Sequence, residues 1–328
     1  MAKYISKRIL YMIFIFFIMS LLLFFLYNLI PGDPARAELE GVKTKITPEE
    51  YQYRYEQARI RMGLDDPLII RYAKWLGGTL KLDFGMSQVY KQPVATVIKQ
   101  PMKNTIFINI FAVGLALAIT IPLGIYCAVK RNSLFDKLIQ VLTIVGYSLP
   151  TFIISLLFIF AFAVKLEWFP VSGMATPNFT GSSLEVFKDK LWYLALPLGV
   201  MTIGSLGGLT RYIRAAMSDA LSMDYIKTAR AKGLTEKVVI FSHAWRNALL
   251  PIITLLIGWL ISVFSGSLVV ESMFNLNGMG KFYINALTSQ DYNVALAIQL
   301  FYIVIALLGN LITDLSYGLV DPRVRVNK

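Results

Sequence analysis

The stretch that decides the fold is "DYIKTARAKGLTEKVVIFSHAWRNALLP", residues 224–251, a basic insert between two apolar segments. Asp224 suits the N-cap of a helix, and the Ala-, Lys- and Arg-rich run that follows it favours helix formation. Gly233 suits the C-cap of this short helix, and Thr235 the N-cap of a second one that runs toward Leu250-Pro251. The stretch therefore predicts a helix–glycine–helix insert.

The chain around this insert is too apolar for an ordinary water-soluble protein. Of its 328 residues 56% are hydrophobic, and the mean hydropathy is +0.59. Six segments contain no Asp, Glu, Lys or Arg, namely 9–30, 104–129, 138–164, 191–210, 247–270 and 292–313. Each segment is long enough, as a helix, to cross the roughly 30 Å of hydrocarbon in a bilayer. We predict an all-α membrane protein with six transmembrane helices.

Lysine and arginine set the expected orientation. The N-terminal "KYISKR" (3–8) precedes a long apolar run with no small-residue cleavage site after it, which favours an uncleaved signal anchor over residues 1–30. The short connecting segments on the N-terminal side of the membrane hold most of the Lys and Arg, which predicts that both termini lie in the cytoplasm. The net charge of +12 is then a sign of topology rather than of nucleic-acid binding.

The first connecting segment, 31–103, is long enough to form a helical subdomain outside the cell. "TPEEYQYRYEQARIRMG" (47–63) predicts an amphipathic helix with a capping box made by Thr47 and Glu50. Its expected cluster consists of Tyr51, Tyr55, Ala58 and Ile60. A second helix is expected from Pro67 to Gly77-Gly78. The remaining chain, 104–328, is expected to be a core of five membrane spans that contains the cytoplasmic loop 211–250.

Proline and small residues suggest how the spans pack. Pro122, Pro150 and Pro197 lie inside predicted spans, which favours kinked helices around a cavity. The small residues Gly204, Gly208, Gly258, Ser262 and Gly266 recur at helical spacing. Such spacing allows close helix packing, and the same residues are also candidates for lining a substrate pathway.

The chain carries none of the usual signs of an energy source or an enzyme. The spans hold no ionisable relay, and only Glu271 and Asp314 approach membrane depth. His243 is the only histidine, so no metal site is expected, and Cys127 is the only cysteine. "NLNGMGKF" (275–282) lacks the Ser or Thr and one glycine of a phosphate-binding loop. We expect no cofactor in this chain, so energy for uphill transport must come from another protein.

Two interpretations of the insert follow from the residues alone. Ala229, Ala231 and Gly233 offer little bulk, which suits packing into a groove of a partner protein. A basic helix that rests on anionic lipid headgroups fits the composition equally well.

A resemblance favours the first interpretation. "TARAKGL" (228–234) and "HAWRNALLP" (243–251) resemble the EAA loop of ABC-transporter permease subunits, in the form typical of the oligopeptide/dipeptide/nickel family. The match lies at Ala229, Gly233 and Leu250-Pro251. It departs at Lys227, where the family has an acidic residue, and at Thr228, where it has alanine. The spacing from Gly233 to the Leu-Pro pair is also longer than in the general motif.

Other motifs extend the resemblance over nearly the whole chain. They are "PGDPA" (31–35), "GLDDPLIIRYAKWLGGTLKLDFGMS" (63–87), "SLPTF" (148–152), "ESMFNLNGMGKFYINALTSQDY" (271–292) and "DLSYGLVDPRVR" (314–325). One departure is Asn277, where the family usually has proline. The order of the motifs and the long first outside loop resemble the B-type permease of this family.

The resemblance implies a type I ABC importer fold in a bacterial or archaeal cell membrane. It implies a heterodimer with a C-type permease subunit, two cytoplasmic ATPase subunits that bind ATP-Mg, and an extracellular or periplasmic substrate-binding protein. The residues it assigns to ATPase coupling are Asp224, Tyr225, Thr228, Ala229, Arg230, Ala231, Lys232, Gly233, Leu234, Leu250 and Pro251. Those it suggests for the binding protein or a gate are Glu271, Phe274, Gly278, Gly280 and Asp291.

The expected function is therefore a non-catalytic permease subunit for oligopeptides or dipeptides. Nickel or another small solute is the alternative substrate within the same family. A stand-alone secondary transporter and a membrane scaffold without transport are less favoured, because the spans lack ionisable groups and the insert looks built for a partner.

Overall fold

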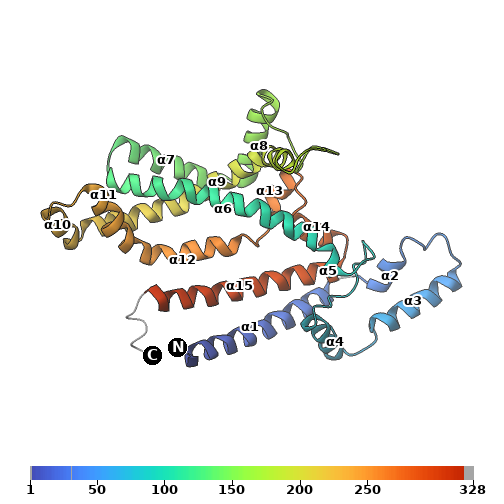
Figure 1. The fold of residues 1–328 in the computed structure, drawn as a ribbon. Coiled ribbons are helices and arrows are strands. Elements are labelled where there is room, and N and C mark those ends of the chain that lie inside the picture. Colours follow the sequence, from blue (N-terminus) through green and yellow to red (C-terminus); the bar gives the residue numbers. More distant parts are fainter. Residues whose placement is uncertain (1, 31, 321–328) are drawn as a thin grey trace. The chain divides into compact units, whose positions relative to one another are not determined.

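The computed structural model describes residues 2–30 and 32–320, and apart from one antiparallel bridge between Met86 and Pro93 its regular structure is helical (Figure 1). The described parts of 1–103 and 278–307 form one compact unit, and those of 104–277 and 308–328 form a second. The motif residues Pro31 and 321–325 lie outside the described part of the chain.

The helices before the insert begin and end as follows: α1 Ala2–Leu29, α2 Pro34–Leu39, α3 Pro48–Met62, α4 Leu68–Leu80, α5 Val94–Val97, α6 Lys99–Val129, α7 Leu134–Ser148, α8 Thr151–Phe158, the π-helix η1 Ile159–Lys165, and α9 Ser183–Ser222. From the insert onward they are α10 Asp224–Ala231, α11 Glu236–Val238, the π-helix η2 Val239–Trp245, α12 Arg246–Ser262, α13 Leu268–Met273, α14 Met279–Thr288 and α15 Tyr292–Val320.

Four of the six apolar segments are single helices. The described chain has four helices that are long and apolar enough to cross a membrane, in α1, α5–α6, α9 and α15, and up to six if two bent helix pairs each count as one span. Pro122 and Pro197 lie inside α6 and α9, which continue through them. Neither proline therefore breaks its helix.

The third and fifth segments are the bent pairs. The third turns by 104° between Ser148 and Thr151, where Pro150 begins α8 and cannot extend α7 (Figure 1). The fifth bends by 69° where Pro251 follows Leu249 and Leu250. The bend at Pro150 confirms the kink expected there, whereas no kink was expected at Pro251, because apolar length alone does not reveal a change of direction.

The fifth segment also ends earlier than the predicted residue 270. Helix α12 stops at Ser262, and the chain restarts as α13 at Leu268. The amide of Asn109, from α6, donates to the backbone oxygens of Val263 (3.0 Å) and Ser265 (2.7 Å) and, at 3.4 Å, of Ser262. Asn109 therefore supplies hydrogen bonds to carbonyls at the end of α12, where the Ser262 oxygen also accepts from the Ser265 amide at 2.9 Å.

The loop after α1 is helical, with two corrections to the expected details. Thr47 caps α3 by accepting from the Glu50 amide at 3.2 Å, but the Glu50 carboxylate pairs with Arg54 instead of closing a capping box. Helix α4 continues through Gly77-Gly78 to Leu80. Of the expected cluster on α3, Ala58 is buried and the two tyrosines stack, whereas Ile60 is 67% exposed.

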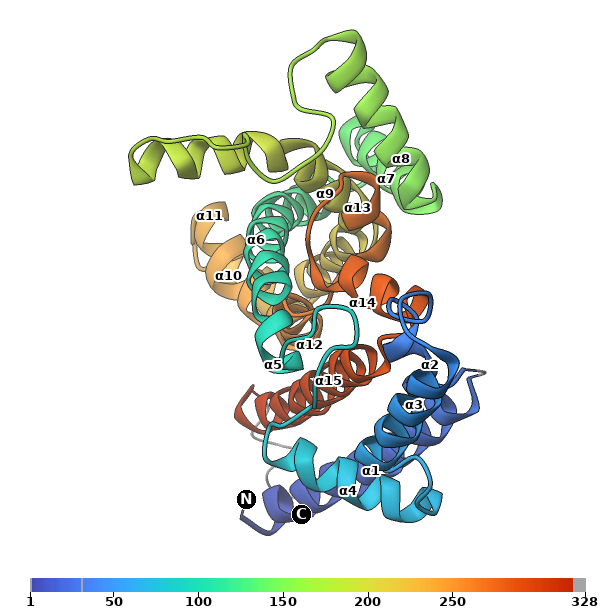
Figure 2. The ribbon, with the colours of Figure 1, turned by 90° about the vertical axis from the view of Figure 1, so that its right-hand side faces the viewer.

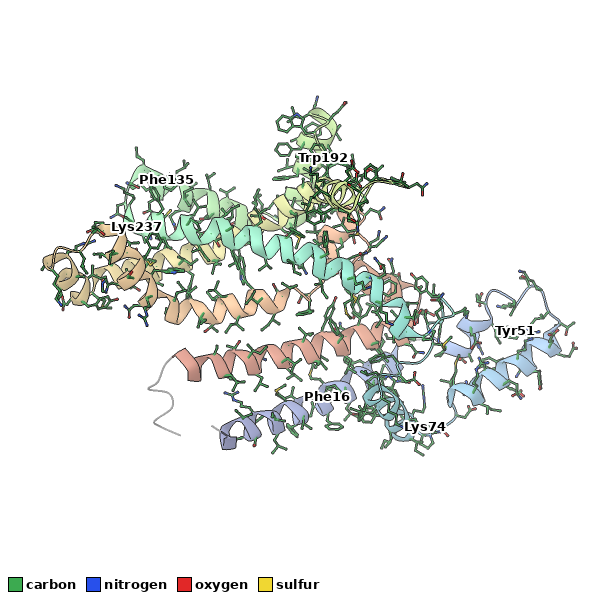
Figure 3. The ribbon with its side chains drawn as sticks, viewed as in Figure 1. Phe16, Tyr51, Lys74, Phe135, Trp192 and Lys237 are labelled. Atoms are coloured by element: carbon green, nitrogen blue, oxygen red, sulfur yellow. The ribbon has the colours of Figure 1, made fainter. Side chains whose placement is uncertain are left out.

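Within the first unit, α4 packs against α1 (Figure 2). The ring of Phe24 contacts Tyr72 (5.6 Å between centroids) and Trp75 (5.4 Å). The Tyr72 hydroxyl lies 2.9 Å from the hydroxyl of Ser20. Figure 3 marks Lys74 on α4 and Phe16 on α1.

In the second unit, α9 is the helix against which the others pack. It contacts α7, α8, α12 and α13, and it leads directly into α10. A Cβ added at Gly207 would lie 2.6 Å from Tyr147 Cβ and 2.7 Å from the Thr143 carbonyl oxygen of α7. Gly207 is therefore the residue that lets α7 and α9 approach so closely.

Candidate functional site: the insert and its anchor

The first helix of the insert, α10, begins one residue earlier in register than expected. Met223 occupies the N-cap position, so Asp224 is the first helical residue rather than the cap. The Asp224 carboxylate accepts from Lys227 Nζ at 2.8 Å, and its carbonyl accepts from the Thr228 hydroxyl at 3.1 Å. A carboxylate in the first turn is favoured by the positive end of the helix dipole.

The glycine that ends α10 is required by its backbone. Gly233 has a φ of 76°, in the left-handed region. Its amide donates to the Arg230 oxygen at 2.9 Å, and the Leu234 amide donates to the Ala229 oxygen at 3.4 Å. This pair of bonds is a Schellman motif, which satisfies carbonyls at the end of the helix.

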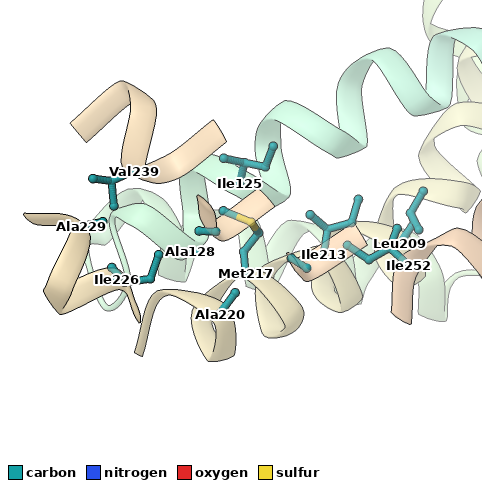
Figure 4. Packing of buried hydrophobic residues seen from close by; sticks show 12 residues of the cluster. Ile125, Ala128, Leu209, Ile213, Met217, Ala220, Ile226, Ala229, Val239 and Ile252 are labelled. Carbon is teal, nitrogen blue, oxygen red and sulfur yellow. The ribbon is translucent and has the colours of Figure 1, made fainter. Parts of the chain in front are cut away.

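Helix α10 is held by its own chain through a buried apolar face. Ile226 and Ala229 are buried in a cluster with Val239 of η2, residues of α6 and α9, and Ile252 of α12 (Figure 4). Ala229 therefore packs inside the chain and is not part of the small-residue face expected to meet a partner. Ala231 and Gly233 are exposed.

The opposite face of α10 is open and polar. The exposed residues of the insert's first helix and turn are Asp224, Tyr225, Lys227, Thr228, Arg230, Ala231, Lys232, Gly233 and Leu234. Arg230 bridges to Glu236 of α11, with Nε–Oε1 at 2.7 Å and Nη2–Oε2 at 3.1 Å. This bidentate pair fixes α10 against α11 across the glycine turn.

The second half of the insert merges into the following span. Thr235 lies at the N-cap of α11 but makes no side-chain capping bond. Chain 236–262 is continuously helical through η2, and Pro251 lies inside α12 rather than in its first turn. The side chain of Leu250 lies outside the described part of the structure.

The five residues suggested for a binding protein or gate are all buried, so none of their side chains is exposed to a partner here. Glu271 accepts from the Thr105 hydroxyl and the Ser267 amide, each at 3.2 Å. Phe274 belongs to the apolar core of the second unit, and Gly278 and Gly280 lie at the start of α14.

Asp291, the fifth of these residues, belongs to the first unit. Its Oδ2 accepts from the Ser87 hydroxyl at 2.5 Å and from the Val89 amide at 3.3 Å. Asn293 donates to the Met86 oxygen at 2.9 Å. Together these bonds hold segment 85–91 to the start of α15, a link that sequence reasoning missed because it joins residues about two hundred positions apart.

The small residues divide between packed and open positions. No heavy atom lies within 4 Å of a Cβ built at Gly204, Gly208 or Gly258, so these glycines do not mediate packing within the described chain. Ser262 is exposed, and its hydroxyl donates to the Trp259 oxygen at 2.7 Å. Gly266 is half-buried between α12 and α13. The packed glycines of α9 are instead Gly199, against Phe158, and Gly207.

The helices, the bent spans and the anchored insert define a multi-pass cell-membrane protein of the type I ABC importer permease class. A chain of an inward-facing crystal structure of the MetNI methionine ABC transporter aligns with a TM-score of 0.50 at 15% identity, over 66% of this chain and 94% of that one. At this identity the likeness concerns the fold.

The chain belongs to the family of binding-protein-dependent transport system inner membrane components. The family's main model matches residues 120–326, and the model of its N-terminal part matches residues 1–109. The oligopeptide transport system permease protein AppB of Bacillus subtilis is 37% identical over 99% of both chains. The dipeptide transport system permease protein DppB of the same species is 32% identical over 100% of this chain and 99% of that one. A putative peptide permease protein of Brucella suis is 36% identical over 99% of this chain and 100% of its own.

Proposed function

We propose that this chain forms half of the membrane pathway of an ATP-driven peptide importer and performs no catalysis itself. Relatives that match it from end to end are named as oligopeptide and dipeptide permeases, which supports peptide over nickel as the substrate. Its partners would be a C-type permease subunit, two ATPase subunits that bind ATP-Mg in the cytoplasm, and a substrate-binding protein on the other side.

The observation that carries the coupling role is the two-sided character of α10. One face is buried through Ile226 and Ala229 against helices of the membrane core, and the other face is exposed and polar. A helix of this kind can be pressed from outside and pass the displacement to the spans, because it is packed against α9 and η2 rather than tethered by a flexible loop. Alternating access by such rigid-body movement is a known class of transition.

Gly233 offers a sharp test of coupling. Proline there would require a φ near −65°, against 76° in the structure, and would remove the amide that donates to Arg230. We expect Gly233→Pro to abolish peptide uptake and peptide-stimulated ATP hydrolysis in proteoliposomes that contain both permeases, the ATPases and the binding protein. Gly233→Asn is the matched control, since asparagine tolerates the left-handed region.

The two variants should insert into the membrane in equal amounts. Full uptake by Gly233→Pro would contradict the coupling role. Flux through vesicles that contain this chain alone, driven by a gradient and indifferent to ATP, would instead favour a stand-alone transporter. The substrate is tested separately, by purifying the complex with its binding protein and identifying the bound ligand by mass spectrometry.

A further inference from the structure

The first unit contains a cavity that plays no part in coupling. It has a volume of about 890 Å³ and is lined by residues of α1 to α4, by segment 85–91 and by the first turn of α15. Small-molecule sites commonly measure about 300–1,000 Å³, so the cavity has the size of a ligand site. One wall of the cavity is apolar and the other is cationic, which indicates a ligand that has both an apolar and an anionic part.

One wall is apolar and lies along a membrane span. Phe24 of α1, Trp75 of α4 and Leu296 of α15 line it. Helix α4 reaches deep along this span, because Tyr72 meets Ser20 well inside the apolar segment of α1. Helix α4 also carries large exposed apolar side chains on its outer surface, at Ile69, Ile70 and Leu80. An amphipathic helix with aromatic residues in this position is typical of the membrane interface.

The other wall is cationic. The lining contains five Lys or Arg residues, Arg59, Arg61, Arg71, Lys74 and Lys91, against the two acids Asp33 and Glu38. Arg59, Arg61 and Lys74 are paired with carboxylates, at 2.5–3.3 Å. Arg71 and Lys91 remain without a bonded carboxylate in the described chain, which favours an anionic ligand.

Arg71 is one of two cations of the lining, with Lys91, that have no bonded carboxylate in the described part of the structure, although Asp66 lies near enough to attract it. Among the described residues it makes no hydrogen bond or ion pair, and the nearby acid Asp66 is bound to Lys74 at 2.6 Å. Burial, together with the positive charge of Arg59, lowers the pKa of Arg71 from its usual value. Half-burying an arginine next to a second cation is unfavourable unless an anion joins them.

Two further polar atoms of the lining also lack partners. The hydroxyl of Tyr292 and the Oε1 of Gln88 are buried and make no hydrogen bond in the described structure. A buried polar atom without a partner costs about 1–3 kcal/mol. Tyr292 and Gln88 line the cavity, but both atoms are closed off from solvent, so a ligand would pair with them after a small movement of their side chains.

We propose that this cavity binds an anionic phospholipid from the leaflet at the C-terminal end of α1. The phosphodiester would bind Arg71 and the Tyr292 hydroxyl, a glycerol hydroxyl of the headgroup would donate to Gln88, and the acyl chains would lie along Phe24 and Trp75. A soluble phosphate would satisfy the cations but leave the apolar wall unused. The amphipathic lining thus favours a lipid over a free anion.

Binding can be measured on the purified, delipidated full chain by titration with short-chain phosphatidylglycerol and native mass spectrometry. We expect Arg71→Gln to weaken binding at least about tenfold, the usual effect of losing a charge-assisted hydrogen bond. Tyr292→Phe, which removes only the hydroxyl, should weaken it by a smaller factor. Arg54→Gln is the matched control, because Arg54 pairs with Glu50 on α3 and does not line the cavity.

Two partial analogues identify the part of the lipid that is recognised. Glycerol 3-phosphate should bind far more weakly than phosphatidylglycerol, and diacylglycerol should bind without dependence on residue 71. Unchanged phosphatidylglycerol affinity in both Arg71→Gln and Tyr292→Phe would overturn the proposal. So would tight binding of glycerol 3-phosphate alone, or displacement of the lipid by a tripeptide. Should Arg71→Gln fail to fold, Tyr292→Phe and Lys91→Gln decide the question.

Discussion

Arg214 and Asp136 form a bidentate ion pair that ties the start of α7 to α9. The Nε–Oδ1 distance is 2.6 Å and the Nη2–Oδ2 distance is 2.7 Å, and the Asp136 side chain is only 2% exposed. Asp136 also accepts from the Asn132 amide at 2.9 Å, which orders the turn between α6 and α7. Arg214 lies two turns before the end of α9, close to the insert.

Removing one member of this pair should destabilise the second unit. Arg214→Met leaves a buried carboxylate without its partner, a change that typically costs about 3–5 kcal/mol. We expect a lower midpoint of unfolding in detergent. Arg214→Met combined with Asp136→Leu should recover much of the loss, because the double variant buries no charge. A double variant less stable than Arg214→Met would contradict this account.

Adjacent glycines of α9 should respond differently to alanine. Gly207→Ala places a methyl group against Tyr147 and the Thr143 oxygen, and overpacking of this kind costs about 1–3 kcal/mol. Gly208→Ala meets no atom within 4 Å and gains helix propensity worth up to about 1 kcal/mol. The two unfolding midpoints, measured side by side, check the prediction. Equal effects would mean that Gly207 does not set the packing of α7 on α9.

A larger side chain at Gly208 tests what covers the open face of α9. We expect Gly208→Leu to leave the unfolding midpoint of the isolated chain unchanged. If the second permease subunit packs there, co-purification of the two subunits falls; if the substrate pathway runs there, the complex stays intact but peptide uptake falls. A variant that both assembles and transports normally would exclude both roles for this glycine.

The Asn109 amide should matter for the end of α12. Asn109→Ala leaves the Val263 and Ser265 carbonyls without their donor, and such a loss costs about 1–3 kcal/mol. Hydrogen–deuterium exchange should rise in 259–267. Asn104→Ala, which loses the bond to the Asn277 oxygen at an exposed position, is the control and should leave exchange in 259–267 unchanged.

Asp33 should make the stability of the first unit depend on acid. Burial of the Asp33 carboxyl disfavours its charged form. Its pKa is nevertheless lowered by hydrogen bonds from the Tyr55 hydroxyl and the Ala35 and Arg36 amides, and by the positive charge of Arg59. A carboxyl whose pKa is lower in the folded state stabilises that state at pH values above its unfolded-state pKa. This stabilisation is lost as the pH falls through the folded-state pKa. We expect the unfolding midpoint to drop below about pH 4, and Asp33→Asn to flatten that drop. Parallel curves for the two proteins would contradict it.

The sequence predicted the helices better than their directions. Uncharged length identified α1, α6, α9 and α15, because a fully apolar helix of that length has no other stable environment. Sequence reasoning expected a kink at Pro150 but did not distinguish it from Pro122 and Pro197, which lie inside unbroken helices. Which proline ends a helix depends on what the neighbouring helices can satisfy.

The site was predictable where its geometry is local. Gly233 followed from the composition around it, and its left-handed backbone agrees with that prediction. The register of buried faces was not predictable: Ala229 lies inside, and Gly207 rather than Gly204 or Gly208 is packed, although these differ by one turn or less. Successive residues point about 100° apart on a helix, so only the position of the neighbouring helix decides between them.

The shortness of α10 limits how force is transmitted from this helix to the spans. Eight residues give a rod of about 12 Å, barely longer than the diameter of a helix. A force on its exposed face would therefore act directly on the buried side chains of Ile226 and Ala229, which pack against the rest of the chain. The Arg230–Glu236 ion pair would hold α10 in place against α11. Ile226→Ala would leave empty space at this buried contact. A displacement applied to α10 from outside would then be absorbed by movement of α10 itself before it reached the spans.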